Sequence, residues 1–157
     1  MPYSTLLLAL GNDIMRDDAA ALVAAGILKE RFSGRVDFVS TIKVGLTLMD
    51  IMSGYDRVLL LDTIVTGEHQ PGTIMEFSEA DFKTILELSP HFMSLPDVIE
   101  LAKRLSIDFP KEILILALEI EQPMEFGETL SPAIAQAIPE YVQKAEHILG
   151  RWLPDKP

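Results

Sequence analysis

The sequence predicts one α/β domain over residues 1–157, a three-layer sandwich built on a mostly parallel, twisted sheet of about five strands. One strand is expected to be antiparallel at an edge, and helices are expected on both faces of the sheet. A chain of 157 residues fits a single domain, and its 48% hydrophobic content is enough to form a core. Short apolar runs alternate with helical patterns along the chain, which is typical of parallel sheets with crossover helices.

Five segments are expected to form the strands. Three are continuous apolar runs, as in strands buried on both faces, and one follows the turn Gly67–Gly72 and is expected at the sheet edge. In chain order the strands are Leu6–Leu10, Val36–Val39, Val58–Leu61, Thr73–Phe77 and Ile113–Leu118. Because sites in such sheets form at the carboxyl ends of strands, the residues that follow these strands are the candidates for function.

Four helices are expected: Ala19–Phe32, Leu46–Met52, a segment after Ser94, and Pro132 to Trp152. Ser94-Leu95-Pro96-Asp97 has the capping-box pattern, and Ser131-Pro132 places proline at the first helical position. Pro139 is expected to interrupt and bend the last helix. The expected apolar faces comprise Leu22, Val23, Ile27 and Phe32 in the first helix, Val98, Ile99, Ala102 and Leu105 in the third, and Ile134, Ile138, Val142, Ala145, Leu149 and Trp152 in the last.

Composition excludes several classes of function. The absence of cysteine rules out a disulfide scaffold, a thiolate metal site and a cysteine nucleophile, and it agrees with a cytoplasmic location. The net charge of −11 disfavours a nucleic-acid partner. The apolar run Leu6–Leu10 is too short for a signal-peptide core or a membrane span, so no membrane association is expected. No Gly-x-Ser-x-Gly nucleophile elbow is present, so a hydrolase of this sequence would use water activated by a carboxylate or a metal.

Acidic residues follow the first and third predicted strands. Asp17 and Asp18 stand where the first helix begins; Asp17 suits the N-cap, and Asp18 would be kept ionised by the helix dipole. Asp62 follows the third strand, so Asp18 and Asp62 could face one crevice and bind a cation there. The alternative is structural: both aspartates of the pair would only cap the helix, and Asp62 would form an Asx turn before Thr63.

The chain has three histidines, and one is a candidate ligand. His69 falls in a surface turn, and His147 is expected on the solvated side of the last helix. His91 lies in Ser89-Pro90-His91-Phe92-Met93-Ser94, a loop with apolar neighbours that could be held against the body of the protein. A lone loop histidine is more often structural, but with Asp18 and Asp62 it could complete a three-ligand site that leaves positions open for substrate.

Four motifs in order resemble the hydrogenase maturation proteases, which process nickel–iron hydrogenase large subunits. The similarity runs from Leu6 to about Trp152. The motifs are Gly11-Asn12 with Asp17-Asp18; Leu60-Leu61-Asp62-Thr63; Pro90-His91-Phe92-Met93-Ser94-Leu95; and Gln122-Pro123 followed by Gly127-Glu128-Thr129-Leu130-Ser131-Pro132-Ala133-Ile134.

The resemblance implies an endopeptidase, a hydrolase that removes the C-terminal extension of a nickel–iron hydrogenase large-subunit precursor after nickel insertion. By this likeness Asp18, Asp62 and His91 are both the metal-recognising and the catalytic residues. Nickel would arrive with the substrate, so that the protein needs no permanent metal, and zinc, cadmium or calcium could occupy the site in vitro.

The sequence departs from the family pattern at several glycines. Ala19 and Ala21 stand where glycines usually follow the acidic pair, and little effect on the fold is expected because alanine favours helix. Ser40-Thr41-Ile42 replaces the usual Asp-Gly-Gly after the second strand, where the loss of glycine would alter how substrate fits.

Other classes of protein share parts of this pattern. A phospho-receiver-like signalling domain also has an acidic pair after its first strand and an aspartate after its third, and it binds magnesium. Such a domain would need a lysine after its last strand, where Leu118-Glu119-Ile120-Glu121 stands here. A peptidyl-tRNA hydrolase would also have Gly11-Asn12 after an apolar strand, but the acidic charge argues against RNA. A non-catalytic metal- or hydrogenase-binding paralogue would keep the acidic crevice without cutting.

Overall fold

The structure is a computed structural model that describes residues 4–42, 45–82, 95–121 and 126–154. Strands alternate with helices through most of this length, as the sequence predicts. The elements are β1 (Thr5–Leu10), the 3-10 helix η1 (Arg16–Ala19), α1 (Ala20–Phe32), β2 (Asp37–Thr41), α2 (Leu46–Met52), β3 (Arg57–Ile64), β4 (Ile74–Ser78), the 3-10 helix η2 (Glu79–Asp81), α4 (Leu95–Arg104), β5 (Glu112–Glu119) and α5 (Pro132–Trp152).

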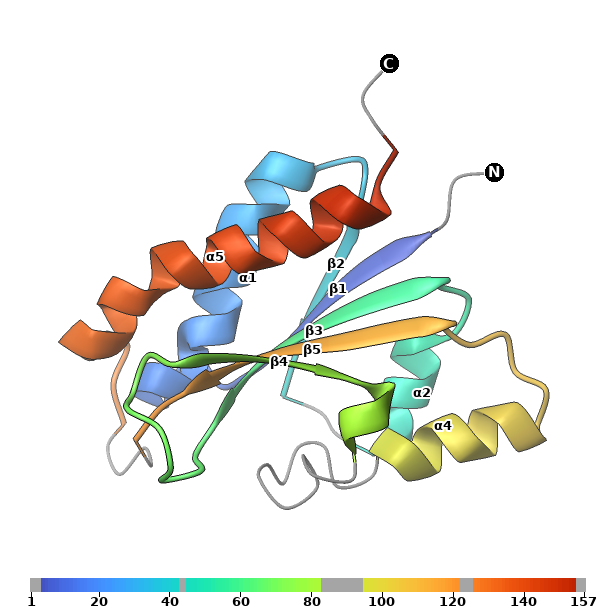
Figure 1. Ribbon diagram of the computed structural model, residues 1–157, viewed down its shortest axis with the longest axis horizontal. Helices are drawn as coiled ribbons and strands as arrows, with labels where there is room; N and C mark the ends of the chain where they lie inside the picture. The colour runs from blue at the N-terminus through green and yellow to red at the C-terminus, as the bar shows by residue number, and fades with distance from the viewer. Residues whose placement is uncertain (1–3, 43–44, 83–94, 122–125, 155–157) are drawn as a thin grey trace.

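The strands form one five-stranded sheet in the order β2-β1-β3-β5-β4. Four strands are parallel, and β4 runs antiparallel to β5 at the edge. α1 and α5 cover one face of the sheet, and α2 and α4 cover the other (Figure 1). The predicted three-layer α/β fold is therefore confirmed. β1 pairs with β2 on one side and with β3 on the other, and after β2 the chain crosses over β1 to form β3. The topological switch point, where such sheets usually bind ligands, therefore lies between β1 and β3.

The sheet separates two apolar clusters, one under each helical layer. Successive side chains of a strand point to opposite faces, so Leu7 and Ala9 of β1 join the cluster beneath α1 and α5. Leu6 and Leu8 join the cluster beneath α2 and α4. Both faces of β1 are thereby fully buried, which explains why its sequence is continuously apolar rather than alternating.

The buried face of α1 differs from the predicted one. Val23 is 41% exposed, and Leu22, Ile27 and Phe32 are only partly buried. The face that packs inward comprises Ala20, Ala21, Ala24, Ala25 and Leu28. Small side chains allow α1 to lie close to the sheet and to α5, so a face chosen from the largest apolar residues was wrong.

Three other features of the helices and strands differ from the sequence prediction. β3 continues to Ile64, so Asp62 lies within the strand rather than after it. Leu105 follows α4 and is 59% exposed. α5 runs through Pro139 without interruption, and its predicted apolar face is buried as expected. The capping box proposed at Ser94 falls outside the described residues.

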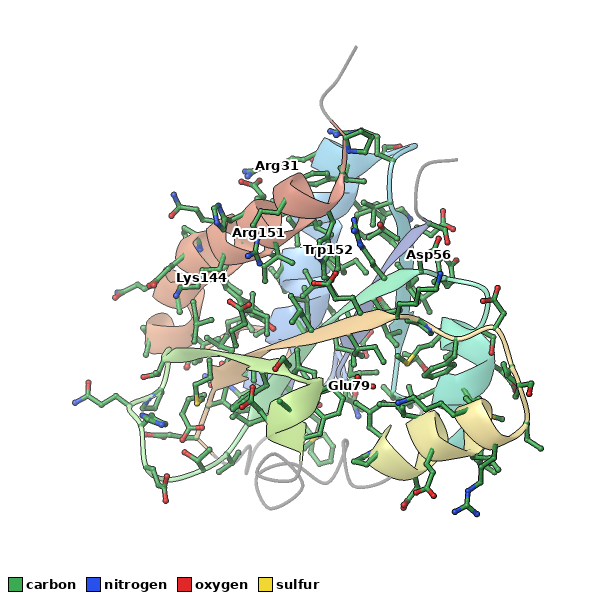
Figure 2. All side chains as sticks on the ribbon, turned by 45° about the vertical axis from the view of Figure 1, so that its right-hand side comes forward. Arg31, Asp56, Glu79, Lys144, Arg151 and Trp152 are labelled. Carbon is green, nitrogen blue, oxygen red and sulfur yellow. The ribbon has the colours of Figure 1, made fainter. Side chains whose placement is uncertain are left out.

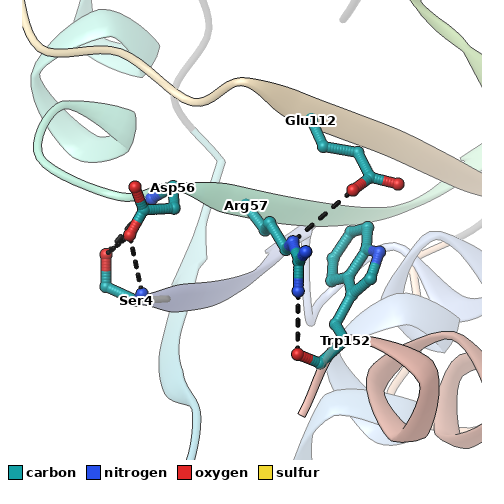
Figure 3. Close-up of polar contacts among 5 residues, drawn as sticks. All are labelled: Ser4, Asp56, Arg57, Glu112 and Trp152. Atoms are coloured by element: carbon teal, nitrogen blue, oxygen red, sulfur yellow. Dashed lines mark hydrogen bonds and ion pairs between the residues drawn. The ribbon is translucent and has the colours of Figure 1, made fainter. Parts of the chain in front are cut away.

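The amino-terminal edge of the sheet is closed by polar contacts (Figure 3). The Asp56 carboxylate accepts hydrogen bonds from the backbone N–H and the hydroxyl of Ser4, at 2.9 and 3.1 Å. The Arg57 guanidinium donates to the carbonyl oxygen of Trp152 at 2.8 Å and lies 3.5 Å from the Glu112 carboxylate. These contacts tie β1, β3, β5 and the end of α5 together at the edge opposite the strand carboxyl ends.

α5 presents one apolar and one charged face. Trp152 lies between the end of this helix and the sheet and is 7% exposed, whereas Lys144 and Arg151 are on the exposed side (Figure 2). Among the described residues, no helix combines the length and the apolar character needed to cross a membrane.

Candidate active site

The loop after β1 passes close to η1 at the carboxyl end of the sheet. The Gly11 N–H donates to the carbonyl oxygen of Thr41 at the end of β2, at 3.2 Å. A Cβ atom on Gly11 would lie only 2.4 Å from the backbone carbonyl oxygen of Asp18. Glycine permits this approach, and the approach brings Asp18 to the end of β1.

Asp18 is held from two sides through its two carboxylate oxygens. Its Oδ2 accepts a hydrogen bond from the backbone N–H of Asn12 at 2.9 Å. Its Oδ1 accepts a hydrogen bond from the hydroxyl of Thr63, in β3, also at 2.9 Å. The carboxylate therefore bridges the loop after β1 and the neighbouring strand, across the topological switch point.

Asp62 is a buried carboxylate within β3. The residue has no exposed surface, and its Oδ1 accepts a hydrogen bond from the backbone N–H of Thr63 at 2.7 Å. Its position inside a strand excludes the Asx turn that the sequence left open. β1 pairs with β3 as far as Ala9↔Leu61, so Asp62 comes directly after the last paired residue of β3 on that side.

Thr63 joins the two carboxylates. Its hydroxyl contacts Asp18 and its backbone N–H contacts Asp62. The structure therefore brings Asp18 and Asp62, which are 44 positions apart in the printed sequence, to the same residue at the carboxyl edge of the sheet. Carboxylate oxygens are the ligands that divalent cations such as Ca²⁺ and Mg²⁺ prefer, which makes these two side chains the candidates for a cation site.

Asp17 has a different task from its neighbour. Its Oδ1 and Oδ2 accept hydrogen bonds from the backbone N–H and the hydroxyl of Ser131, at 2.7 and 2.8 Å. Ser131 is the residue at which α5 begins. Neither η1 nor α1 has a side-chain cap, so the prediction that Asp17 caps the first helix was wrong. It anchors the start of α5 to η1.

A second contact holds the segment before α5 against the loop after β1. Met15 and Gly127 form a parallel β-bridge, the Arg16 N–H donates to the carbonyl oxygen of Gly127 at 2.9 Å, and the Gly127 N–H donates to that of Ile14 at 2.9 Å. A Cβ atom on Gly127 would lie 2.8 Å from Cγ of Arg16. The glycine of the fourth sequence motif thus lies where this segment packs against the side chain of Arg16, at the start of η1.

The third predicted ligand, His91, lies outside the described residues. The other two histidines, His69 and His147, are exposed, as expected. Within residues 4–42, 45–82, 95–121 and 126–154, no group of three potential ligands gathers. The described part of the candidate site is therefore the pair Asp18 and Asp62 with the donors that hold them.

Two buried polar residues near the strand ends were not anticipated. Glu119 ends β5, is 1% exposed, and accepts hydrogen bonds from the backbone N–H groups of Thr66 and Gly67, which fixes the loop after β3. The Tyr141 hydroxyl contacts the carbonyl oxygens of Leu116 and Asp62, at 2.7 and 3.2 Å. Burial, and then the charge of Asp62, raise the pKa of Tyr141 well above its usual value. The sequence signal for Glu119 was an acid at the end of an apolar strand, the pattern that also marked Asp62.

The residues that replace the usual glycines are accommodated locally. Ala19 and Ala21 are buried in the core, at 6% and 0% exposure, and Ala21 lies within α1. Ser40 and Thr41 complete β2, and the Thr41 carbonyl receives the hydrogen bond from the loop after β1. Ile42, the next residue, is 70% exposed.

Comparison with known sequences identifies relatives of this chain. The sequence pattern of the hydrogenase maturation protease family matches residues 25–148, a range that includes Asp62 and His91 and begins after Asp18. The hydrogenase 2 maturation protease of Escherichia coli (strain K12) is 26% identical over 137 residues, which cover 85% of this chain and 82% of that protein. A hydrogenase expression/formation protein, HoxM, of Cupriavidus necator is 24% identical over 92% of this chain and 73% of its own length.

Solved structures share the fold. The hydrogenase maturating endopeptidase HybD from E. coli superposes with a TM-score of 0.81 at 22% identity, covering 94% of this chain and 93% of that one. The NiFe hydrogenase maturation protease HybD from Thermococcus kodakarensis has a TM-score of 0.73 at 27% identity, covering 93% and 99%. β5 ends at Glu119, where a receiver-like domain would need a lysine. The chain belongs to the hydrogenase maturation protease family, and the protein is a peptidase, a hydrolase.

Proposed function

We propose that this peptidase removes the C-terminal extension of a nickel–iron hydrogenase large-subunit precursor after nickel has been inserted. Family membership supports the class of substrate. The observation that carries the proposal is the pairing of Asp18 and Asp62 through Thr63 at the topological switch point. In a peptidase without a nucleophilic cysteine or a Gly-x-Ser-x-Gly elbow, such carboxylates can serve hydrolysis, because they can bind a cation that activates water.

The proposed metal is nickel carried by the substrate. The two carboxylates of Asp18 and Asp62 supply oxygen ligands, and His91, which the sequence places in the loop before α4, would supply a nitrogen ligand. This mixed set suits a borderline divalent cation. Each carboxylate is held by hydrogen-bond donors, as metal-binding carboxylates usually are. Because the cation would come with the precursor, only a nickel-loaded precursor would be bound correctly.

The chemistry follows from this arrangement. A cation held by Asp18 and Asp62 would supply Lewis-acid chemistry: it would polarise the scissile carbonyl and lower the pKa of water. The two carboxylates would hold the cation, and with it the precursor, at the carboxyl edge of the sheet. Water adds to the carbonyl carbon, the C–N bond breaks, and the released amine takes up a proton. The products are the mature subunit with a new C-terminal carboxylate and the free C-terminal peptide.

Exposed apolar side chains in the segments next to the strand carboxyl ends support a protein substrate. Among the described residues, most large hydrophobic side chains that are exposed lie in the segments next to the strand carboxyl ends: Ile14, Ile42, Leu46, Val65 and Phe126. Phe126 precedes Gly127, whose N–H binds the carbonyl of Ile14. Apolar residues gathered at one edge typically mark a surface that contacts another protein.

The test is a processing assay with purified precursor, loaded with nickel or free of nickel. We expect cleavage only of the loaded precursor, and its loss in the variants Asp18→Ala, Asp62→Ala and His91→Ala. The matched control is His147→Ala, which removes an exposed histidine of α5 that is 85 positions after Asp62 in the sequence and should cleave normally. If all three site variants still trim the loaded precursor, the assigned roles are wrong.

A further inference from the structure

The side chain of Thr63 is placed differently from that of its neighbour Asp62. Side chains alternate along β3: Leu59 and Leu61 join the cluster beneath α1 and α5, whereas Leu60 joins the cluster beneath α2 and α4. By this alternation Thr63 projects toward the layer of α1, where Asp18 lies at the helix start. Thr63 is 4% exposed, so its hydroxyl has little access to water.

The two donors of Thr63 serve two different carboxylates. The hydroxyl donates to Oδ1 of Asp18 at 2.9 Å, and the backbone N–H donates to Oδ1 of Asp62 at 2.7 Å. A β-branched side chain in a strand has few χ1 choices, so the hydroxyl position is fixed by the backbone. The strand that sets the position of Asp62 therefore also sets the position of the Asp18 carboxylate.

We propose that Thr63 is a positioning residue that fixes the Asp18 carboxylate relative to Asp62, so that both bind one cation in a single geometry. This inference rests on the proposed function. Without the hydroxyl, Asp18 keeps its bond from Asn12 but can rotate away from β3. The cation would then be held by a mobile ligand, which reduces affinity and misplaces the scissile bond.

Two substitutions separate the hydrogen bond from the packing of the side chain. Thr63→Val keeps the shape and removes the donor, whereas Thr63→Ser keeps the donor and removes the methyl group. We expect Thr63→Val to weaken nickel binding about 10- to 100-fold, in a titration with the nickel ion alone. With the nickel-loaded precursor we expect kcat to fall by a similar factor and KM to change little. Thr63→Ser should restore both to within a few-fold.

A double-substitution cycle tests whether Thr63 acts through Asp18. In an Asp18→Ala background, Thr63→Val should cause no further loss of nickel affinity. Three results would overturn the inference. The Thr63→Val and Thr63→Ser variants could lose nickel affinity equally, Thr63→Val could bind nickel and cleave the precursor as well as the wild type, or the losses of nickel affinity in the cycle could be additive. Circular dichroism and thermal unfolding show whether each variant is folded, and Thr63→Ser keeps the test valid if the Val variant is not.

The outcome distinguishes this inference from the proposed function. If Asp18→Ala and Asp62→Ala abolish processing while Thr63→Val is normal, the inference fails and the proposed function stands. If the wild type cleaves no precursor but Thr63→Val weakens nickel binding as expected, the proposed function fails and the positioning role stands.

Discussion

The adjacent residues Asp17 and Asp18 offer a controlled comparison between a structural carboxylate and one that is proposed to bind the cation. Each accepts two hydrogen bonds at 2.7–2.9 Å, one from a backbone N–H and one from a hydroxyl. Asp17 binds Ser131 at the start of α5, whereas Asp18 binds Asn12 and Thr63. We predict that Asp17→Asn and Asp18→Asn lower stability to a similar extent but differ by orders of magnitude in processing.

The expected loss of stability follows from the hydrogen bonds. Asparagine keeps one acceptor oxygen for the backbone N–H, and its amide group can donate to the hydroxyl oxygen. Each substitution thus converts two charge-assisted hydrogen bonds into neutral ones, at about 0.5–1 kcal/mol each. The total of about 1–2 kcal/mol corresponds to a decrease in Tm of about 2–8 °C for a domain of this size. Both variants should therefore be folded at 25 °C.

The assay measures kcat/KM for the nickel-loaded precursor at 25 °C, beside thermal unfolding of each variant. Asp17→Asn should keep activity within a few-fold of wild type. Asp18→Asn should lose at least 100-fold, because a neutral amide is a poor ligand for a divalent cation. Comparable activity of the two folded variants, or a greater loss in Asp17→Asn, would refute the division of roles between the two aspartates.

Three further predictions concern stability and substrate contact. Tyr141 is held neutral by burial, so its pKa is raised. The unfolded chain ionises this group near pH 10 and the folded chain does not, so stability should fall above pH 10, by up to about 1.4 kcal/mol per pH unit. Urea unfolding from pH 9 to 11 should show a smaller fall in Tyr141→Phe; an unchanged pH dependence would contradict this account. Gly11→Ala should destabilise by about 1–3 kcal/mol, because its Cβ would lie 2.4 Å from a backbone carbonyl oxygen in η1. Gly26→Ala, whose Cβ meets nothing within 4 Å, should instead stabilise α1 by about 0.5–1 kcal/mol, and equal melting temperatures for the two variants would rule out the close approach. Phe126→Ala should raise KM for the precursor several-fold, whereas Leu105→Ala, an exposed residue that follows α4, should not. A steady-state assay that finds equal KM values would argue against a substrate surface at the strand carboxyl ends.

Several elements of the fold could be predicted because their physical signals are local. Runs such as Leu6–Leu10 and Ile113–Leu118 are apolar on both faces, which is the pattern of central strands in a covered sheet. Ser131-Pro132 gives the start of α5, since proline has no N–H to lose there. The inward face of α1 could not be predicted in this way. It depends on how closely α1 approaches its neighbours, which selects alanines over larger residues.

The sequence by itself determined the α/β class, the strands, and the choice of Asp18 and Asp62 as candidate site residues. These features could be predicted because burial patterns and strand ends depend on residues that are close together along the chain. Only the tertiary structure decided which acid of the adjacent pair faces β3, that Asp62 lies inside its strand, and that Thr63 contacts both. These features are contacts between residues that are distant along the chain. Their partners are set by the register of β1 against β3 and by the docking of α5, which no local pattern encodes.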